Sequence, residues 1–312
     1  MIKSRMVWLV LVMGLTFIFG MAPGVDAQPH HGKFYLVGTG PAGPEYATLK
    51  AIKTIKKADL VLCDKRMEEM FQTYLKGKKV EDPWKELWHH QGKMWIEVLP
   101  RLQPEEGRAL VKEKMRQRDK FVQRIKGLLA QGKKVVLLDG GDPTIYSRSY
   151  WLLEGLDDDQ VEIVPGVGAL SASMAALKRH STSSGTRFLA QTSGYSFFGK
   201  TDRDDLARDL SHLPGTLVVY MGLRDAKKLV KSLKKFNPGD LPVAVVYFAG
   251  YRDKEKIVKG NLNNILEKID PEKEKFMGLI IVGRCLDGPR FPMQELNQLI
   301  QPTRAEPVKD RQ

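Results

Sequence analysis

The sequence predicts an α/β fold class, and three observations support that prediction. Short, strongly apolar runs recur along the chain, and such runs are typical of strands that are covered on both faces. Segments with a helical period, in which lysines separate the apolar residues, lie between several of these runs. Glycine-rich turns directly follow three of the runs. The 312-residue length suffices for two domains, each with its own core.

The predicted elements follow in order from residue 34. Phe34–Val37 is the first strand, and a glycine turn and a helix over Tyr46–Lys57 lead to a second strand at Asp59–Cys63. A helix that begins by Phe121 ends at Gly132 and precedes the strand Val135–Leu138. The later strands are expected at 161–166, 216–222, 242–248 and 278–283.

The first 27 residues have the pattern of an export signal. Lys3 and Arg5 precede an uninterrupted apolar stretch over 6–22, and Val25-Asp26-Ala27 offers a small-residue cleavage site. The stretch is at the short end for a membrane-spanning helix. We therefore expect a cleaved signal peptide over 1–27, with an uncleaved anchor as the alternative. In either case the rest of the chain would be exported, to the periplasm in a bacterium with two membranes.

Net charge limits the classes of partner, and cysteine content limits the possible disulfides and metal sites. A net charge of +13 and a pI of about 9.5 favour acidic partners without choosing among nucleic acid, anionic lipid and a polycarboxylate ligand. Cys63 and Cys285 are far apart in the sequence, and we expect two buried free thiols, with one disulfide as the alternative. We expect no metal site, because no Cys/His cluster has zinc-ligand spacing.

The segment 65–120 has no clear pattern, but part of it is rich in aromatic residues. The stretch EDPWKELWHHQGKMW contains three tryptophans and two adjacent histidines. Such residues can line a macrocycle or base pocket. The interpretation we favour is an aromatic patch that packs against the sheet.

The first glycine turn, GTGPAGP over 38–44, has the G-x-G-x-x-G spacing of a dinucleotide-binding loop, and Asp64 ends the next apolar run. However, Pro41 and Pro44 remove two of the N–H donors that a pyrophosphate needs. Pro44 instead suits the first position of a helix. A nicotinamide-dependent dehydrogenase is therefore the least favoured interpretation.

Two more glycine turns come directly after strands. DGGDPTIYS spans 139–147, and the turn at Gly166–Gly168 comes after the strand VEIV. Open α/β sheets bind ligands at the carboxyl ends of their strands. Three such turns predict one cleft that holds a small ligand mainly through backbone groups.

With these turns the chain resembles the tetrapyrrole (corrin/porphyrin) methylases, which are class III S-adenosylmethionine-dependent methyltransferases. The resemblance covers roughly 33–285 and rests on five blocks in order. These are VGTGPAGPEYATLKAIKTIKKADLVLCD, LLDGGDPTIYS, VEIVPGVGALSA, GTLVVYMGL and the pair KIVKGNL and GLIIVG. Any one block is unspecific, whereas all five in order are specific.

The resemblance implies two α/β domains with the active site in the cleft between them, and a homodimer. The implied limits are 33–166 for the N-terminal domain and 167–290 for the C-terminal domain, followed by a polar tail over 291–312. The implied activity is C-methylation of a tetrapyrrole of uroporphyrinogen or precorrin type, as in porphyrin and cobalamin biosynthesis. The implied cofactor is S-adenosyl-L-methionine.

The resemblance also assigns residues by position. Asp64 corresponds to the acidic residue proposed as general base in uroporphyrinogen methylases, and a carboxylate suits that role. Arg66, Arg148 and Arg187 are candidates, by their neighbourhood, for pairing with the carboxylates of the substrate, but the interpretation we favour for each is a surface ion pair. The residues assigned to the cofactor are Pro41, Gly140, Gly141, Asp142, Ile145, Gly168, Ala169, Met221 and Gly260.

Two departures from the family pattern favour an alternative. Ala42-Gly43 stands where Gly-Asp is usual, and Gly168 stands where a Thr or Ser is usual. S-adenosylmethionine is moreover a cytoplasmic metabolite. The alternative is an exported tetrapyrrole- or metabolite-binding protein that has lost catalysis; a mis-assigned start would instead make this an ordinary methyltransferase. We do not expect a nucleic-acid partner, because the Pro-Ile-Gly-Asn type loop of related rRNA methylases is not present.

Overall fold

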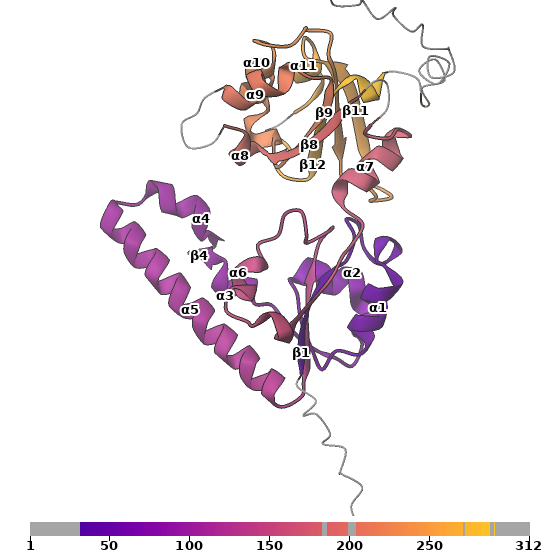
Figure 1. The fold of residues 1–312 in the computed structure, drawn as a ribbon. Helices are drawn as coiled ribbons and strands as arrows, with labels where there is room; N and C mark the ends of the chain where they lie inside the picture. Colours follow the sequence, from indigo (N-terminus) through magenta and orange to yellow (C-terminus); the bar gives the residue numbers. More distant parts are fainter. Residues whose placement is uncertain (1–31, 183–185, 199–203, 271, 288–289, 291–312) are drawn as a thin grey trace, which may run out of the picture.

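The computed structural model describes residues 32–182, 186–198, 204–270, 272–287 and 290. These residues form two lobes, one above the other in Figure 1, and each lobe is built around a five-stranded sheet. We call 32–164 the first lobe and 169–287 the second lobe. The predicted signal segment 1–27 and the tail 291–312 lie outside the described residues, and the domain limits 33–166 and 167–290 stay predictions.

The first sheet has the strand order β3-β2-β6-β1-β7, and all of its neighbouring strands are parallel. Its strands are β1 Lys33–Gly38, β2 Leu60–Leu62, β3 Lys79–Glu81, β6 Lys134–Asp139 and β7 Val161–Val164. Because every strand runs the same way, all five carboxyl ends meet at one edge of the sheet, which we call the carboxyl edge. The opposite edge is the amino edge.

Helices cover both faces of the first sheet, as its apolar strands predict. Residues of α1 and α2 form a core with one face, and residues of α3, α5 and α6 form a core with the other. The helices of this lobe are α1 Leu49–Lys56, α2 Lys65–Leu75, α3 Trp84–Leu87, α4 Trp95–Val98, α5 Pro104–Ala130 and α6 Tyr150–Leu153, with 3-10 turns η1 Pro44–Tyr46, η2 Leu99–Arg101 and η3 Asp158–Gln160. Pro44 begins η1, so the expectation that it suits a first helical position is confirmed.

The second sheet has the order β11-β10-β12-β9-β8, and only β8 and β9 are parallel. The α/β class is confirmed, but here apolar strands form a mainly antiparallel sheet. Its strands are β8 Phe188–Ser193, β9 Gly215–Tyr220, β10 Pro242–Tyr247, β11 Lys256–Asn261 and β12 Gly278–Val282. Its helices are α7 Ala169–Leu177, α8 Gly194–Phe198, α9 Asp205–Ser211, α10 Ala226–Leu233 and α11 Ile265–Lys268, with 3-10 turns η4 Leu223–Asp225 and η5 Arg284–Leu286.

The carboxyl edge of the first sheet faces the second lobe. The loop after β1 contacts it through Glu45, whose carboxylate lies 3.3 Å from the Arg252 guanidinium. The start of α2 contacts it through Arg66, which donates to the Tyr251 hydroxyl at 3.4 Å. On the other side of the molecule, Glu97 of α4 pairs with Arg224 at 2.7 Å. The lobes therefore meet along more than one line of contact.

The aromatic segment packs against the first sheet, so the interpretation we favoured is confirmed. Trp84 is buried in the core beneath α5, and Trp88 packs edge-on against it, with ring centroids 6.2 Å apart. The short hairpin β4 His89–His90 and β5 Lys93–Met94 comes next. Lys114 of α5 holds this segment, because its buried ammonium donates to the carbonyls of Glu86 and His89, each at 2.7 Å.

Three further features of the described residues concern membrane-spanning helices, thiols and metal sites. No helix within the described ranges is both long and apolar enough to cross a membrane. Cys63 and Cys285 are both buried thiols that form no disulfide, as expected. Burial raises the pKa of the Cys63 thiol to about 12, and nearby Glu68 adds to the effect. Among the described residues no group of three or more His, Cys, Asp or Glu side chains could hold a metal ion.

Candidate active site at the carboxyl edge

The three predicted glycine turns pack against one another at the carboxyl edge. A Cβ on Gly38 would lie 2.6 Å from the Gly166 nitrogen, and a Cβ on Gly166 would lie 2.1 Å from the Gly141 oxygen. Real Cβ atoms do not approach other atoms this closely, so these contacts require glycine. The predicted convergence of the three turns is therefore a physical contact between backbones.

The first turn is not built to cradle a pyrophosphate. Gly40 and Gly141 exchange two backbone hydrogen bonds, Gly141 N–H to Gly40 O at 2.8 Å and Gly40 N–H to Gly141 O at 3.2 Å. Both glycines have positive φ, 76° and 77°. Pro41 has no N–H, and the Gly40 amide is occupied, so the loop presents few donors to phosphates. The objection to a dinucleotide-binding loop is confirmed.

The second turn is held by two carboxylates. Asp139, at the end of β6, accepts hydrogen bonds from the hydroxyls of Ser147 and Ser149. Asp142 accepts from the amide and the hydroxyl of Thr144, at 3.0 and 2.8 Å. These bonds fix both ends of the loop, and the predicted contribution of Asp142 is to shape the turn. Gly140 and Gly141 lie between the two carboxylates.

Apolar side chains border this turn from both lobes. Ile145 is 42% exposed and Met221 is 48% exposed, although both are large and apolar. Met221 comes directly after β9 and has a positive φ of 52°, which is unusual for a side chain of its size. Rings of Tyr146 and Tyr220, their sequence neighbours, meet across the lobes with centroids 5.0 Å apart. Ile145 and Met221 therefore belong to one region.

The third turn leads into α7. Gly168 caps this helix and Ala169 is its first residue. A Cβ on Gly168 would lie 3.7 Å from the Asp142 Cβ, so the second and third turns adjoin at this point. Nothing lies within 4 Å of a Cβ placed on Gly141. Open backbone flanked by exposed apolar side chains fits an adenosyl group, which is bound by backbone polar groups and apolar contacts.

Gly260 does not lie in this region, which corrects its predicted role. In the second sheet, Leu217 is level with Val282, Val282 with Val243, and Val243 with Gly260. Met221 is four residues further along β9, so Gly260 is displaced by roughly 13 Å along the strands and lies three strands across. Because β11 is antiparallel to β10, its carboxyl end points away from the first lobe.

Gly250 lies where Gly260 was expected. It comes after β10, which runs in the same direction as β9, and its φ is +86°. A Cβ on Gly250 would lie 2.8 Å from the Tyr46 ring, at the turn after β1. The signal that could have identified it is its position three residues beyond an apolar strand, like the other glycine turns.

Asp64 lies at the same edge and is already engaged. One carboxylate oxygen caps α2 by accepting from the Met67 amide at 3.0 Å, and the other lies 3.6 Å from the Arg148 guanidinium. Arg148 in turn lies over the Trp84 ring, 4.2 Å from its centroid. Burial lowers the pKa of Arg148, while the charges of Asp64 and Asp139 oppose that shift. Asp64 and Arg148 thus form a charged pair beside the glycine turns.

The three arginines suggested for the substrate are not equivalent. Arg148 and Arg66 lie at the carboxyl edge. Arg187 precedes β8 and its amide bonds the Pro214 carbonyl, which places it at the far end of the second sheet. Arg187 is therefore not brought to the candidate site.

Known proteins match this chain over most of its length. Residues 33–266 match the model of the tetrapyrrole (corrin/porphyrin) methylases. A cobalt-precorrin-4 C(11)-methyltransferase of Methanocaldococcus jannaschii is 30% identical over 270 residues, 85% of this chain and 92% of the relative. A uroporphyrinogen-III C-methyltransferase of the same organism is 29% identical over 82% of this chain and 97% of the relative.

A chloroplastic uroporphyrinogen III methyltransferase of Arabidopsis thaliana is 30% identical over 70% of this chain but only 54% of its own length. Among solved structures, the chain matches a cobalt precorrin-4 methyltransferase with a TM-score of 0.63 and 24% identity, over 85% of this chain and all of the other. It matches uroporphyrin-III C-methyl transferase from Thermus thermophilus, complexed with S-adenyl homocysteine, with a TM-score of 0.55 and 29% identity over 82% and 99% of the chains. The chain belongs to the tetrapyrrole (corrin/porphyrin) methylase family.

Proposed function

We propose that this protein is an S-adenosylmethionine-dependent C-methyltransferase that acts on a tetrapyrrole of uroporphyrinogen or precorrin type. One observation carries the proposal: the family match spans both lobes, and the matched glycine turns are the ones that pack together at the edge facing the second lobe. A relative of known structure was solved with S-adenyl homocysteine, the product form of the methyl donor. These findings favour the methyltransferase over the non-catalytic alternative.

The residues around the glycine turns contact the cofactor in different ways. When bound, S-adenosylmethionine supplies a methyl group that its sulfonium activates, so the protein has mainly to hold donor and acceptor in line. Gly140 and Gly141 offer open backbone for the cofactor, and Ile145 and Met221 offer apolar contact. Pro41, Asp142, Gly168 and Ala169 border the same turns, which supports their predicted contribution to this pocket.

Asp64 accepts the proton that the pyrrole loses on methylation. Its carboxylate is one-third exposed at the carboxyl edge, which suits a base that must reach a substrate. A general base of this kind accelerates a reaction by about 10²–10⁴-fold. Arg148 and Arg66 are the cations nearest to this position that can pair with substrate carboxylates.

A transfer assay tests the proposal. The purified chain is incubated anaerobically with uroporphyrinogen III and S-adenosylmethionine carrying a labelled methyl group. We expect label in the tetrapyrrole and equimolar S-adenosylhomocysteine, both dependent on both substrates. If cobalt-precorrin-4 is methylated instead, the substrate assignment changes within the family. No transfer to any tetrapyrrole, in a sample that binds the methyl donor, would favour the non-catalytic alternative.

Localisation and assembly complete the proposal. The apolar stretch over 6–22 after Lys3 and Arg5 supports export, with the stretch either cleaved before Gln28 or retained as an anchor. N-terminal sequencing of protein from the native host decides between the two. The family resemblance supports a homodimer. Light scattering of the purified full chain tests this, because a dimer should have twice the chain mass of 35.3 kDa.

A further inference from the structure

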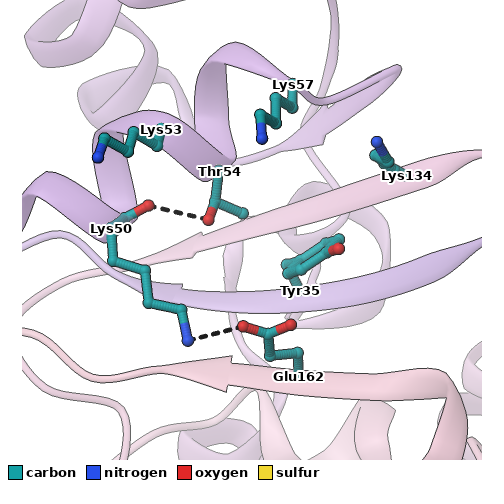
Figure 2. A pocket seen from close by; sticks show the side chains of 7 residues that line it. All are labelled: Tyr35, Lys50, Lys53, Thr54, Lys57, Lys134 and Glu162. Carbon is teal, nitrogen blue, oxygen red and sulfur yellow. Dashed lines mark hydrogen bonds and ion pairs between the residues drawn. The ribbon is translucent and has the colours of Figure 1, made fainter.

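A basic hollow lies on the face of the first sheet that α1 covers. It encloses about 400 Å³ between α1 and strands β1, β6 and β7. Figure 2 shows Lys50 reaching from the helix to Glu162, with Tyr35 beside this pair on the neighbouring strand and Lys53, Lys57 and Lys134 around the hollow. The lining residues are Tyr35, Lys50, Lys53, Thr54, Lys57, Lys134 and Glu162. None of them belongs to the candidate active site.

The charge of this hollow is only partly balanced. Lys50 pairs with Glu162 at 2.8 Å. Lys53, Lys57 and Lys134 make no ion pair with any residue of the described ranges, and all three are exposed. Four ammonium groups thus surround one carboxylate. Partial burial raises the pKa of Tyr35, followed by the charge of Glu162, so its hydroxyl stays neutral and able to donate.

The hollow lies toward the amino edge, where the chain enters the fold. Lys33 begins β1 and is paired in register with Lys134, the first residue of β6. Only ten residues, 23–32, separate Lys33 from the apolar stretch 6–22. Ten extended residues reach at most about 35 Å. If the apolar stretch lies in a membrane, this edge is held close to the membrane surface.

Acidic groups near the amino edge are mostly occupied or lie on the other side of the sheet. Asp59 accepts from the Lys134 amide at 2.8 Å and lies 4.0 Å from the Lys133 ammonium. Asp157, beside the 3-10 turn that precedes β7, pairs with Lys126 of α5. That turn comes after Gly155, which adjoins Val122 of α5, on the face away from α1. Asp158 and Asp159 belong to the same turn and reduce, but do not reverse, the positive charge of this edge.

We propose that the amino edge of the first lobe docks on an anionic lipid surface, with the basic hollow against the headgroups. The inference rests on the alternative in which residues 6–22 stay in the membrane as an uncleaved anchor. Three exposed lysines bind a single small anion weakly, but they act together against a surface that carries many charges. The tether raises the effective concentration of that surface, so weak contacts suffice.

Docking in this way determines the orientation of the molecule. The carboxyl edge lies at the other end of the same parallel strands, so the candidate active site and the second lobe face away from the membrane. Substrate then enters from the aqueous side. A headgroup surface and free phosphate share the same anionic chemistry, and separate vesicle and phosphate measurements distinguish them.

The test uses the full chain in lipid vesicles and reads the distance of two positions from the headgroups. Gln131→Cys labels the amino edge, and Lys234→Cys labels the end of α10 in the second lobe; the native cysteines are buried and leave the new thiol selectively reactive. Vesicles contain headgroup spin-labelled lipid and either phosphatidylcholine alone or 30% phosphatidylglycerol. The charge variant is Lys53→Gln/Lys57→Gln/Lys134→Gln, and its matched control is Lys254→Gln/Lys256→Gln/Lys259→Gln on the second lobe.

We expect quenching at residue 131 but not at residue 234, with anionic vesicles only, and loss of quenching at high salt. At about fivefold per lysine, the charge variant should lower the docked-to-undocked ratio roughly 100-fold, while the matched control leaves it unchanged. Methyl transfer should be unchanged in the charge variant. Equal quenching of charge variant and wild type, or quenching at residue 234 as well, would overturn the proposal.

Two other results also contradict it, in distinguishable ways. If the full chain fails to float with neutral vesicles, residues 6–22 do not insert, and the proposal fails together with membrane retention but not with methyl transfer. The second result concerns inorganic phosphate, for which a specific site should bind below roughly 1 mM. If phosphate at such a concentration protects Lys53 and Lys57 from acylation while vesicles do not, the hollow is a small-anion site.

Discussion

The two lobes bury sheets of similar apolar composition but different strand direction. In the first lobe all strands are parallel, so the turns after β1, β6 and β7 meet at one edge. In the second lobe β11 and β12 run against β9 and β10, so their carboxyl ends point the other way. The glycine turns of the candidate site therefore come mainly from the first lobe, and the second lobe contributes Ala169 at the start of α7 and the residues directly after β9 and β10.

The largest effect should come from the charged pair of the first lobe. Asp64→Asn should lower turnover by about 10²–10⁴-fold, because the amide cannot accept a proton. Binding of S-adenosylmethionine and the melting temperature should change little, since Asn caps helices as well as Asp. The measurement is steady-state methyl transfer beside calorimetric titration of the cofactor.

The matched control is Asp82→Asn, which changes another carboxylate near Arg148. Asp82 accepts from the Trp84 amide, a bond that Asn retains. We expect nearly normal turnover. Equal losses in both variants would show that Asp64 acts only through the charge of Arg148.

A second test sets two glycines of equal conformation against each other. Gly141 and Gly77 both have a φ of +77°, and nothing lies within 4 Å of a Cβ on either. Valine therefore imposes the same backbone strain at both. Gly141→Val should weaken cofactor binding at least about 100-fold, since every tenfold loss costs only about 1.4 kcal/mol. Gly77→Val should bind the cofactor normally. A similar loss of affinity in Gly77→Val would mean that the valine weakens binding by destabilising the fold.

A third test concerns the second lobe. Gly250→Ala places a Cβ 2.8 Å from the Tyr46 ring, whereas Gly260→Ala places one 2.5 Å from the Asn264 side chain at the far end of the sheet. We expect cofactor binding to weaken about tenfold in the first variant and to stay normal in the second. The reverse order in calorimetric titrations would restore the sequence-based role of Gly260.

The smallest effect concerns stability at high pH. Burial raises the pKa of Tyr220 to about 12, with Tyr146 adding to it, whereas an unfolded tyrosine has a pKa of about 10. The hydroxyl stays neutral in the folded state, so its contribution is complete below pH 10. It is lost as the pH rises from 10 to 12, and because the ring is partly exposed, solvent screening reduces this loss to about 1 kcal/mol or less.

Denaturant titrations at pH 9 and pH 11.5 measure this loss. Tyr220→Phe should reduce the decline of the free energy of unfolding with pH. The remaining decline comes from other buried groups such as Cys63, whose pKa is also raised to about 12. An unchanged slope in Tyr220→Phe would mean that the contact between Tyr146 and Tyr220 opens in solution.

The sequence was informative where a local pattern determines structure. Apolar runs predicted seven of the strands, and the prolines of GTGPAGP correctly argued against a pyrophosphate loop. Strand direction is not a local property, because it depends on which strands pair, and that is why Gly260 was misplaced. The first half of α5 was missed because it buries few apolar residues: beside Gly107 and Leu110, its buried residue is Lys114, whose ammonium donates to two carbonyls.

The pairing of Asp64 with Arg148 was also beyond the sequence. These residues come after different strands, and only the order β2-β6 brings the two strand ends together. The same holds for Tyr146 and Tyr220, which come from different lobes. Such contacts depend on tertiary packing, and the spacing of residues along the chain does not predict them.

The methyl-donor site is tested most directly by calorimetric titration of residues 28–312 with S-adenosylmethionine and S-adenosylhomocysteine, since the described fold begins at Gly32. We expect both compounds to bind, with one site per chain and a dissociation constant on the order of micromolar, and we expect Gly141→Val to abolish the binding. A folded sample that binds neither compound would contradict the proposed function, because the family's fold would then have been kept without its methyl-donor site.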